Sequence, residues 1–300
     1  MLRSDSLILA IEPECYRRWL DEARQAATAT LLEKAHSDEA AARLQPARKD
    51  AGDVAVISLN GYISQKPSMM SLLFGGTSSE WFASMVQAAM ADPAIGAVVM
   101  AIDSPGGDVF GIPEAAAAIR AARGKKPMTS VAHPLAASAA YYLASQADEV
   151  VMTPSALVGS IGVKSVHIDE SKALDQAGLN VTEFAYGEHK LDGSSARPLS
   201  EEARAAWQAR MDYYGKLFES DVAKGRRVSV ETVRAKYGQG ALFTAKDALA
   251  AGLVDRIATM DDVLGSLAQG QRRMGARAEV DPLELRARAA LAGLSMEGVE

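Results

Sequence analysis

The chain has 300 residues, 48% of them hydrophobic and 23% charged, which is typical of a globular protein with a substantial buried core. Its 32 Lys and Arg against 38 Asp and Glu give a net charge of -6, which argues against binding nucleic acid through a basic face. The single cysteine, Cys15, excludes an internal disulfide, and no Cys/His group has the spacing of a zinc site. No stretch approaches the ~18 uninterrupted apolar residues of a membrane span, so we expect a cytoplasmic protein.

Three regions of the chain differ in their patterns. Residues 1–50 are predicted to form an N-terminal helical arm, because apolar residues recur at three- and four-residue steps between positions 13 and 47. Residues 51–267 alternate between strand and helix patterns and are interpreted as the main domain. Residues 268–300 are rich in small and charged side chains, which predicts a flexible or partly helical tail.

Strands and helices alternate along the main domain. Short apolar, β-branched runs predict strands at 54–59, 94–103, 128–133 and 148–153. Helical patterns occupy 79–90 and 112–123, begin again near Ser138, and return at 200–223 and 229–237. Residues 241–258 have the pattern of a helix capped by Gly252 and a closing strand. This alternation predicts an α/β fold with βαβ units around a mostly parallel sheet. The apolar loop at 69–74 is either buried or in contact with a partner or an extended substrate.

Two consecutive glycines, Gly106 and Gly107, follow the strand that ends at Asp103. Glycine allows positive φ and lets backbone N–H groups approach a ligand without a Cβ in the way. In α/β sheets, ligands bind outside the carboxyl ends of the strands, where this turn falls. The pair is therefore either an ordinary tight turn or part of an oxyanion hole, which needs backbone donors already in position.

Ser138 stands in a run of alanines between a predicted strand and a predicted helix. A helix N-terminus favours developing negative charge, and small neighbours leave room for a substrate to reach the hydroxyl. The simpler interpretation is a serine that caps the helix. Two further segments stand out: Ser160 lies between Gly159 and Gly162, and Lys190 follows Gly187 on an extended stretch. Taken alone, such a lysine is usually a solvated surface charge.

The order of these motifs is more specific than any one of them. DSPGG, ASAAYY, GSIGV and GEHK, with a later ALAAGLVD, resemble the signal peptide peptidase A (protease IV) family of serine peptidases. The sequence is most similar to phage capsid-assembly (head maturation) proteases of the lambda protein C type. The resemblance extends from about residue 54 to residue 257.

The resemblance implies a ClpP/crotonase-like fold and a Ser–Lys catalytic dyad. Ser138 would be the nucleophile, Lys190 the general base, and Ser160 the serine that hydrogen-bonds the lysine amine. The backbone N–H groups of Gly107 or Gly106 and of Ala139 would form the oxyanion hole. The chain departs from the family at Ala139-Ala140, where many members have Gly-Gly. The backbone donor survives this change, but a positive φ at residue 139 would be unfavourable.

The dyad requires a strong pKa shift. A free lysine has a pKa near 10.4 and is protonated at neutral pH, so it cannot accept the serine proton. Lowering that pKa to about 7–8 takes roughly 3 units, on the order of 4 kcal/mol, which desolvation in an apolar site can supply. The deprotonated lysine would then activate the serine for attack and acyl-enzyme formation. This mechanism needs no metal or organic cofactor.

Other functions remain open at this stage. A Ser–His–Asp peptidase on the same fold would use His167 with Asp169 or Asp192. A crotonase-type acyl-CoA enzyme would leave Ser138 and Lys190 without a role. A cellular peptide-degrading protease, or an inert assembly protein that keeps the fold, would also fit the pattern.

The resemblance also has implications for binding partners and for cellular location. It implies protein or peptide substrates, such as phage scaffold or portal proteins, and a ring-like homo-oligomer. We expect no nucleic-acid partner and no membrane span. A phage-encoded chain would act in the host cytoplasm or the procapsid.

Overall fold

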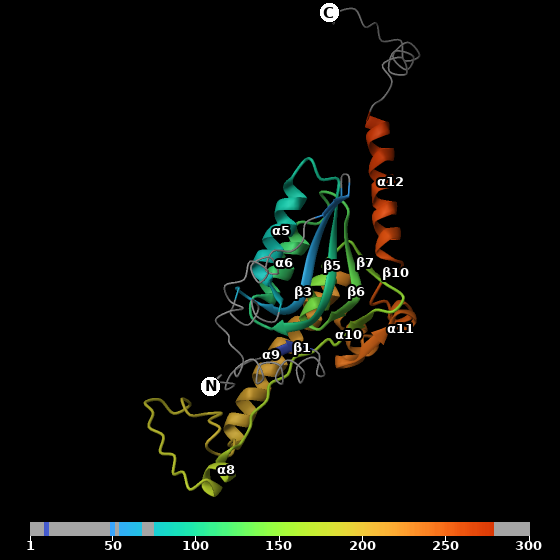
Figure 1. Cartoon of the computed structure of the whole chain (residues 1–300). Coiled ribbons are helices and arrows are strands. Elements are labelled where there is room, and N and C mark those ends of the chain that lie inside the picture. Colours follow the sequence, from blue (N-terminus) through green and yellow to red (C-terminus); the bar gives the residue numbers. More distant parts are fainter. Residues whose placement is uncertain (1–8, 12–48, 52–53, 68–74, 279–300) are drawn as a thin grey trace, which may run out of the picture.

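The computed structural model describes residues 9–11, 49–51, 54–67 and 75–278 (Figure 1). Its strands are β1 (Leu9–Ile11), β2 (Lys49–Ala51), β3 (Val54–Ser64), β4 (Gly76–Ser78), β5 (Ala97–Asp108), β6 (Met128–Ala137), β7 (Glu149–Met152), β8 (Leu157–Gly159), β9 (Leu242–Thr244) and β10 (Arg256–Ile257). Its helices are α5 (Ser79–Ala91), α6 (Ile112–Ala121), α7 (Ala139–Ala144), α8 (Ser171–Gln176), α9 (Glu201–Arg226), α10 (Val230–Lys236), the short 3-10 helix η1 (Gly238–Gly240), α11 (Ala245–Ala251) and α12 (Met260–Ala278).

The described strands form one sheet with the order β10-β7-β6-β5-β3-β2 along its main path. The pairs from β10 to β3 along that path are parallel, whereas β2 pairs antiparallel with β3. Outside that path, β4 and β8 add parallel partners to β3 and β6. The predicted α/β class, with βαβ units around a mostly parallel sheet, is confirmed.

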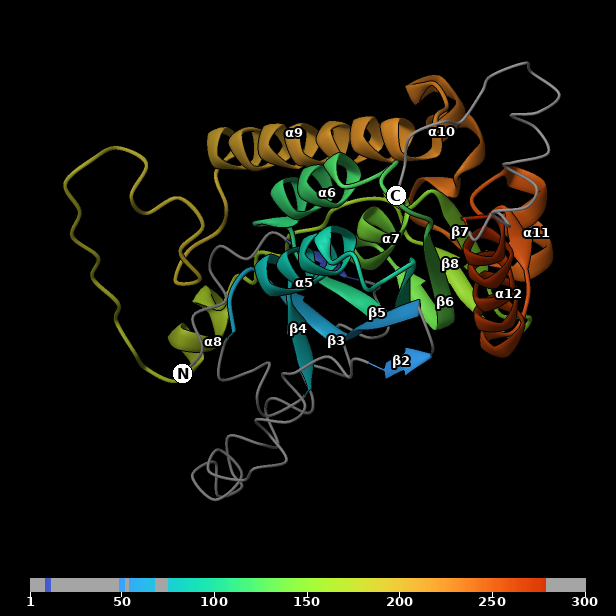
Figure 2. The ribbon, with the colours of Figure 1, turned by 90° about the horizontal axis from the view of Figure 1, so that it is seen from above.

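Helices cover both faces of this sheet, which is why its central strands are apolar on both sides. On one face, residues such as Ile57 and Met100 pack in a core with α5, α6 and α7. On the other face, Val99 and Val131 pack with Val263 of α12. Helix α9 lies outside α6 and α7, so α7 is enclosed between the sheet and α9 (Figure 2).

Strand β5 is longer than the sequence pattern predicts. It continues from Ala97 through the DSPGG motif to Asp108, with a register shift between Ile102 and Ser104. The structure extends this segment because β3 pairs with it as far as Gly107. The tight turn, which was one of the two interpretations of the glycine pair, is therefore wrong, because the pair lies in an extended strand.

The predicted divisions at 1–50, 51–267 and 268–300 fall partly outside the described residues. The helices expected between 13 and 47, and the apolar loop at 69–74, lie outside them. The first region contributes β1 and β2 to the sheet, and α12 continues beyond position 267 to Ala278. Within the described part of the chain, no helix is both long enough and apolar enough to cross a membrane.

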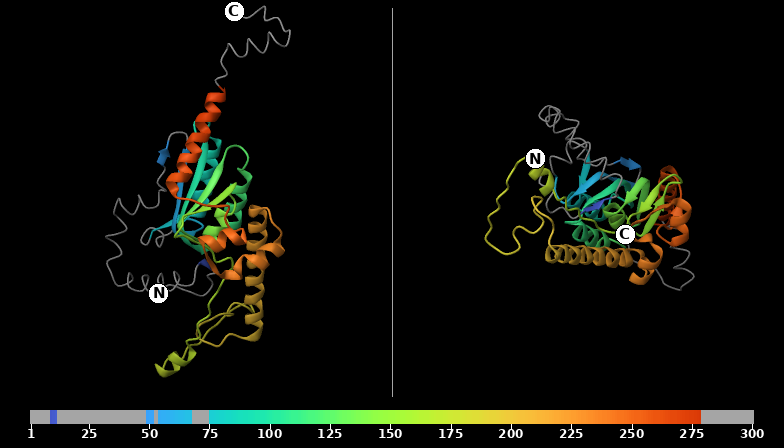
Figure 3. Two further views of the ribbon diagram at one scale, coloured as in Figure 1. Left: turned by 90° about the vertical axis from the view of Figure 1, so that its right-hand side faces the viewer. Right: turned by 90° about the horizontal axis from the view of Figure 1, so that it is seen from below.

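Residues 164–200, here called the projecting segment, leave the sheet and run beside α9 to α8 before returning to the start of α9 (Figures 1 and 3). Exposed apolar side chains are frequent on this segment: Val166, Ile168, Leu179, Val181, Phe184 and Tyr186. Phe184 is 91% exposed and Tyr186 is 100% exposed. Apolar side chains that gather on an exposed surface often mark a contact with another molecule.

Helix α9 approaches the end of α7 closely at Gly225. A Cβ at this position would collide with the backbone oxygen of Ser145 and lie 2.8 Å from the Gln146 amide nitrogen. Gly215, on the same helix, has no heavy atom within 4 Å of the position that a Cβ would take. The two glycines therefore differ in packing while sharing a helix.

We predict that Gly225→Ala lowers the free energy of unfolding by about 2 kcal/mol, because the added methyl group overpacks the α7–α9 contact. Gly215→Ala should instead raise it by up to about 1 kcal/mol, because alanine is the better helix former. Chemical denaturation of both variants measures the difference. Equal effects of the two substitutions would contradict this account of the α7–α9 contact.

Candidate active site

Ser138 stands at the sharp junction between β6 and α7. Its backbone has φ 55° and ψ -122°, a region that costs a non-glycine residue on the order of 1–3 kcal/mol. The residue is only 1% exposed. Its N–H donates to Gly159 O at 2.8 Å, and its carbonyl oxygen accepts from Tyr142 N–H at 2.9 Å. Strain of this kind persists where the surrounding structure holds it, and it concentrates at functional sites.

Ala139 is the first residue of α7, so the positive φ lies one position earlier, at Ser138. This removes the steric objection to alanine at position 139. The N–H groups in the first turn of a helix have no partner within the helix, and that of Ala139 is among them. Ala136, Ala137, Ala139 and Ala140 are fully buried around the serine, so small side chains surround it on both sides in sequence.

The end of β5 reaches the same place. The β5–β6 pairing ends at Ser104 and Ala136, which lie two residues before Gly106 on β5 and two residues before Ser138 on β6. The Ser104 hydroxyl donates to Gly61 O at 2.6 Å and accepts from Gly106 N–H at 3.2 Å. A Cβ at Gly107 would collide with the Ile63 backbone, so only glycine fits there.

Ser160 follows β8, which pairs with β6 through Ala137 and Gly159. In this parallel register, Ser160 and Ser138 are the next residues along the two strands and therefore neighbours. Ser160 is buried, has φ 52°, and donates its N–H to Ala241 O at 2.8 Å. The structure thus brings together Ser138, Ser160 and the Gly106-Gly107 pair.

Lys190 lies elsewhere. It is exposed, and it stands on the projecting segment in a turn where its N–H donates to Gly187 O at 3.2 Å. That segment extends away from α7 and the sheet (Figure 2). In the single chain, the candidate base is therefore not beside the candidate nucleophile.

Of the histidines that the structure describes, none replaces Lys190 beside Ser138. His167 also belongs to the projecting segment, with its Nε2 3.1 Å from Ser194 O and its ring edge-on to Trp207. It lines a cavity of about 410 Å³ with Trp207 and Arg204 of α9. His189 is exposed and 3.0 Å from Asp192, and exposed His133 is 3.4 Å from Thr153.

Helix α7 is held from behind by buried polar contacts. The Tyr141 hydroxyl donates to Leu253 O at 2.7 Å, and the Tyr142 hydroxyl donates to Asp221 at 2.6 Å. Burial raises the pKa of both phenols far above the usual value, so both stay neutral donors. Arg120 and Lys224 neutralise Asp221, at 3.4 Å and 2.8 Å.

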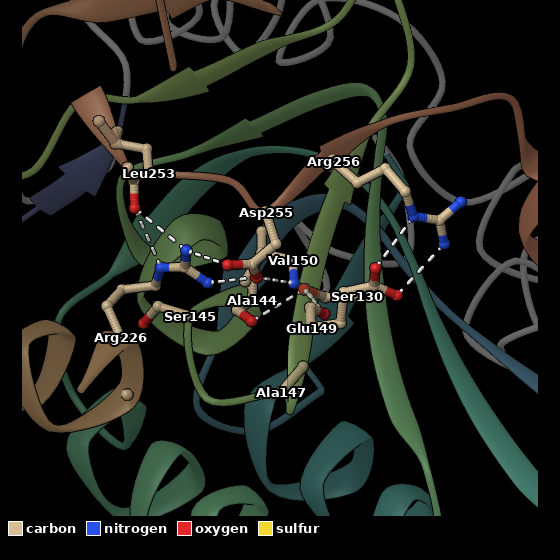
Figure 4. A network of polar contacts seen from close by, with 12 residues as sticks. Ser130, Ala144, Ser145, Ala147, Glu149, Val150, Arg226, Leu253, Asp255 and Arg256 are labelled. Carbon is tan, nitrogen blue, oxygen red and sulfur yellow. Dashed lines mark hydrogen bonds and ion pairs between the residues drawn. The ribbon is translucent and has the colours of Figure 1, made fainter. Parts of the chain in front are cut away.

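The segment that follows α11 is fixed by Asp255 (Figure 4). Its carboxylate accepts two hydrogen bonds of 2.7 Å from Arg226 and one of 2.8 Å from Val150 N–H. Burial raises the pKa of Asp255, but these hydrogen bonds and the charge of Arg226 outweigh it, so the pKa lies below its usual value. This clamp holds Leu253 O in place to receive Tyr141.

Within the described residues, no group of three or more His, Cys, Asp and Glu could hold a metal ion. The site offers hydroxyls and backbone N–H groups. These can form and stabilise a covalent acyl intermediate once a base removes the serine proton.

Comparison with known proteins decides the family. The sequence profile of peptidase family S49 matches residues 120–273, just over half of the chain. The chain belongs to peptidase family S49. The resemblance inferred from the motif order is confirmed, and membership supports a peptidase.

Several known proteins match most of the chain. The head-tail preconnector protein GP5 of Enterobacteria phage P21 is 32% identical over 226 residues, 75% of this chain and 45% of that protein. The capsid assembly protease C of Escherichia phage lambda is 29% identical over 211 residues, 70% of this chain and 48% of its own length. Protease 4 of Salmonella typhi is 32% identical over 219 residues, 73% and 34% of the two chains.

The chain therefore spans less than half the length of each of these relatives. Among solved structures, a membrane-bound stomatin-specific protease aligns at 15% identity and a TM-score of 0.44, over 70% of this chain and 82% of that one.

The sequence analysis did not identify the residues that support the candidate active site. Ser104 orients Gly106, and Asp255 with Arg226 supports α7. A signal was present for Asp255, because it ends the ALAAGLVD motif. No signal marked Arg226 or Asp221, which lie within a long polar helix.

We predict that Asp255→Asn lowers the free energy of unfolding by about 1 kcal/mol at pH 7, because it weakens charged hydrogen bonds at a half-exposed site. A lowered pKa in the folded state stabilises the protein above the usual carboxyl range and is lost as the pH falls through the lowered value. The difference between variant and wild type should therefore shrink below about pH 4. Denaturation at pH 7 and at pH 3 measures it.

Asp175→Asn, on the exposed helix α8, serves as the control and should change stability at neither pH. An Asp255→Asn penalty that is the same at both pH values would contradict a role for the ionised carboxylate.

Proposed function

We propose that this chain is a serine endopeptidase in which Ser138 is the nucleophile and Lys190 the general base. The observation that carries the proposal is the strained backbone of Ser138, buried at the β6–α7 junction beside Ser160 and the Gly106-Gly107 pair. Membership of peptidase family S49 supports it.

The chemistry follows the usual two steps of a serine peptidase. Lys190 Nζ removes the proton from Ser138 Oγ, which attacks the scissile carbonyl carbon and forms a tetrahedral oxyanion. The lysine then gives its proton to the departing amine as the peptide C–N bond breaks, leaving an acyl-enzyme. The same lysine then takes a proton from water, and the hydroxide attacks the ester carbonyl carbon. As the bond from that carbon to Ser138 Oγ breaks, the lysine returns the proton to Ser138 Oγ and the carboxylic acid product leaves.

Two backbone donors would stabilise the oxyanion. The Ala139 N–H lies in the first turn of α7, next to the serine. Of the two glycines, Gly107 is favoured, because Gly106 N–H already donates to Ser104 Oγ. Ser160, adjacent to Ser138 in register, would accept or donate a hydrogen bond to orient the amine of Lys190.

The base must lose its water before it can work. A lysine surrounded by water is a poor base at neutral pH, and burial in an apolar site makes it a better one. The projecting segment must therefore approach the β6–α7 junction and be covered. Its exposed apolar side chains, Phe184 and Tyr186 above all, supply a surface that a second copy of the chain would bury. We propose a homo-oligomer in which this burial desolvates Lys190.

We predict that Ser138→Ala and Lys190→Ala each reduce hydrolysis of an unfolded protein such as labelled casein by about a thousandfold or more, because each removes a covalent or proton-transfer step. His167→Ala should keep activity within a few-fold. It is the matched control for Lys190→Ala, because both substitutions lie on the projecting segment. A fluorophosphonate probe should label the wild type at Ser138, as read by peptide mass spectrometry.

The opposite ranking, with His167→Ala inactive and Lys190→Ala active, would favour a Ser–His–Asp mechanism instead. If the folded wild type neither reacts with the probe nor cleaves casein, the results would favour an inert assembly protein.

We further propose that the natural substrates are phage head proteins, scaffold or portal among them. The support is the similarity to a phage head-tail preconnector protein and a phage capsid assembly protease, over 75% and 70% of the chain. Such a chain would act in the host cytoplasm or the procapsid.

We predict that wild type, incubated with the scaffold and portal proteins of its own phage or prophage, produces new termini that Ser138→Ala does not. Mass spectrometry of the products identifies the cleaved bonds. If the wild type cleaves casein but leaves the head proteins uncleaved, the chain is a peptidase without this capsid role. That result would favour a peptide-degrading protease of the cell.

A further inference from the structure

Strand β1 occupies an edge of β5 next to the candidate nucleophile. It pairs antiparallel with the last residues of β5, with Leu9 opposite Asp108, Ala10 opposite Gly107 and Ile11 opposite Gly106. These are the residues that extend β5 beyond its last pairing with β6. Figure 1 shows β1 at the lower end of the sheet, close to β5.

The edge that β1 occupies can be deduced from the register. Strand β3 already pairs with Gly106 and Gly107 through Tyr62 and Ile63, so one edge of this part of β5 is filled. The opposite edge pairs with β6 only as far as Ala136, because β6 then turns at Ser138 into α7. Strand β1 therefore takes the place of a continued β6, on the side of β5 that faces Ser138.

This edge has the properties of a peptide-binding strand. An unpaired edge presents a row of N–H and C=O groups that bind an extended chain by adding a strand. Glycine at Gly106 and Gly107 lets such a chain approach closely. A substrate bound here would bring its backbone, and so a carbonyl carbon, next to Ser138 Oγ.

We propose that β1 is an internal competitor of the substrate: Leu9–Ile11 occupies the edge of Gly106–Asp108, and a peptide substrate must displace it before Ser138 can react. The proposal rests on the proposed function in one respect, namely that this edge serves a peptidase. The class of ligand it assigns to the edge is an extended, unfolded peptide running antiparallel to β5.

The competition is expected to be modest and reversible. Three residues of strand form a few backbone hydrogen bonds, and each makes only a small net contribution to stability. Tethering to the same chain gives β1 an effective concentration in the millimolar range, which strengthens its hold without new contacts. Substrates with longer strands make more hydrogen bonds and can displace it.

The first test weakens β1 in the full chain. Ala10→Pro removes a backbone N–H and disfavours a strand at that position, whereas Ala10→Val keeps the N–H and a strand-forming residue. The KM for labelled casein should fall about five- to tenfold in Ala10→Pro, with kcat unchanged, and should stay at the wild-type value in Ala10→Val. Equal KM values in all three proteins would overturn the proposal.

The second test locks β1 in place. Leu9 and Asp108 are opposite each other in the register, so a variant with Leu9→Cys and Asp108→Cys can form a disulfide between β1 and β5. The same variant carries Cys15→Ser, which removes the natural thiol. Oxidation to the disulfide should lower casein cleavage at least tenfold relative to the same variant kept reduced with dithiothreitol. Each single cysteine variant, Leu9→Cys or Asp108→Cys in the Cys15→Ser background, should not respond to oxidation and serves as the control. Full activity with the disulfide formed, verified by mass, would refute the competition.

A binding measurement separates this inference from the proposed function. A fluorescent peptide of residues 5–13 should bind Ser138→Ala carrying Ala10→Pro at least fivefold more tightly than Ser138→Ala alone, and a scrambled peptide should bind neither. This readout needs no catalysis, so it holds even if Ser138 proves not to be a nucleophile. Equal binding to both variants in a chain whose wild type cleaves casein would remove the inference and leave the peptidase.

Discussion

The site depends on how β6 ends between two neighbours. Ala136 is paired with Ser104 of β5, and one residue later Ala137 is paired with Gly159 of β8. The chain is held on both sides up to the residue before Ser138, whose N–H then bonds to Gly159 O. To enter α7 from that position, the backbone must turn at Ser138 with a positive φ. The pairing thus creates the strained turn and also brings Ser160 and the glycines of β5 beside it.

A turn that costs energy needs support from elsewhere, and α7 receives it. Tyr141 bonds to Leu253 O, and Tyr142 bonds to a buried carboxylate on α9. Both anchors lie more than 75 positions later in the sequence, at Asp221 and in the segment clamped by Asp255. This explains why the ALAAGLVD motif, which carries no reactive side chain next to Ser138, belongs with the other motifs. The motif fixes the Leu253 carbonyl, which holds α7 through Tyr141.

Local sequence patterns were sufficient for the fold class and for Ser138 at a strand–helix junction, because strand and helix periodicity reflects burial within a few residues. They failed where a distant partner decides the conformation. Gly106-Gly107 looks like a turn in isolation, and becomes a strand because β3 pairs with it. The role of Lys190 as a base was inferred from family resemblance alone. Its local sequence carries no information about where a long exposed segment lies, since few contacts within the chain determine that.

The single chain has Ser138 at the β6–α7 junction but lacks two conditions that the proposed mechanism requires. Its base is exposed to water on the projecting segment, and β1 lies along the edge where a substrate would bind. These conditions have different physical origins. Desolvating a lysine requires burial worth about 4 kcal/mol, which only a large apolar contact supplies, whereas releasing β1 requires breaking a few hydrogen bonds. Association between copies can meet the first condition, and the substrate itself can meet the second. Under the proposed mechanism, the free chain would be inactive, and it would cleave an extended substrate only after assembly.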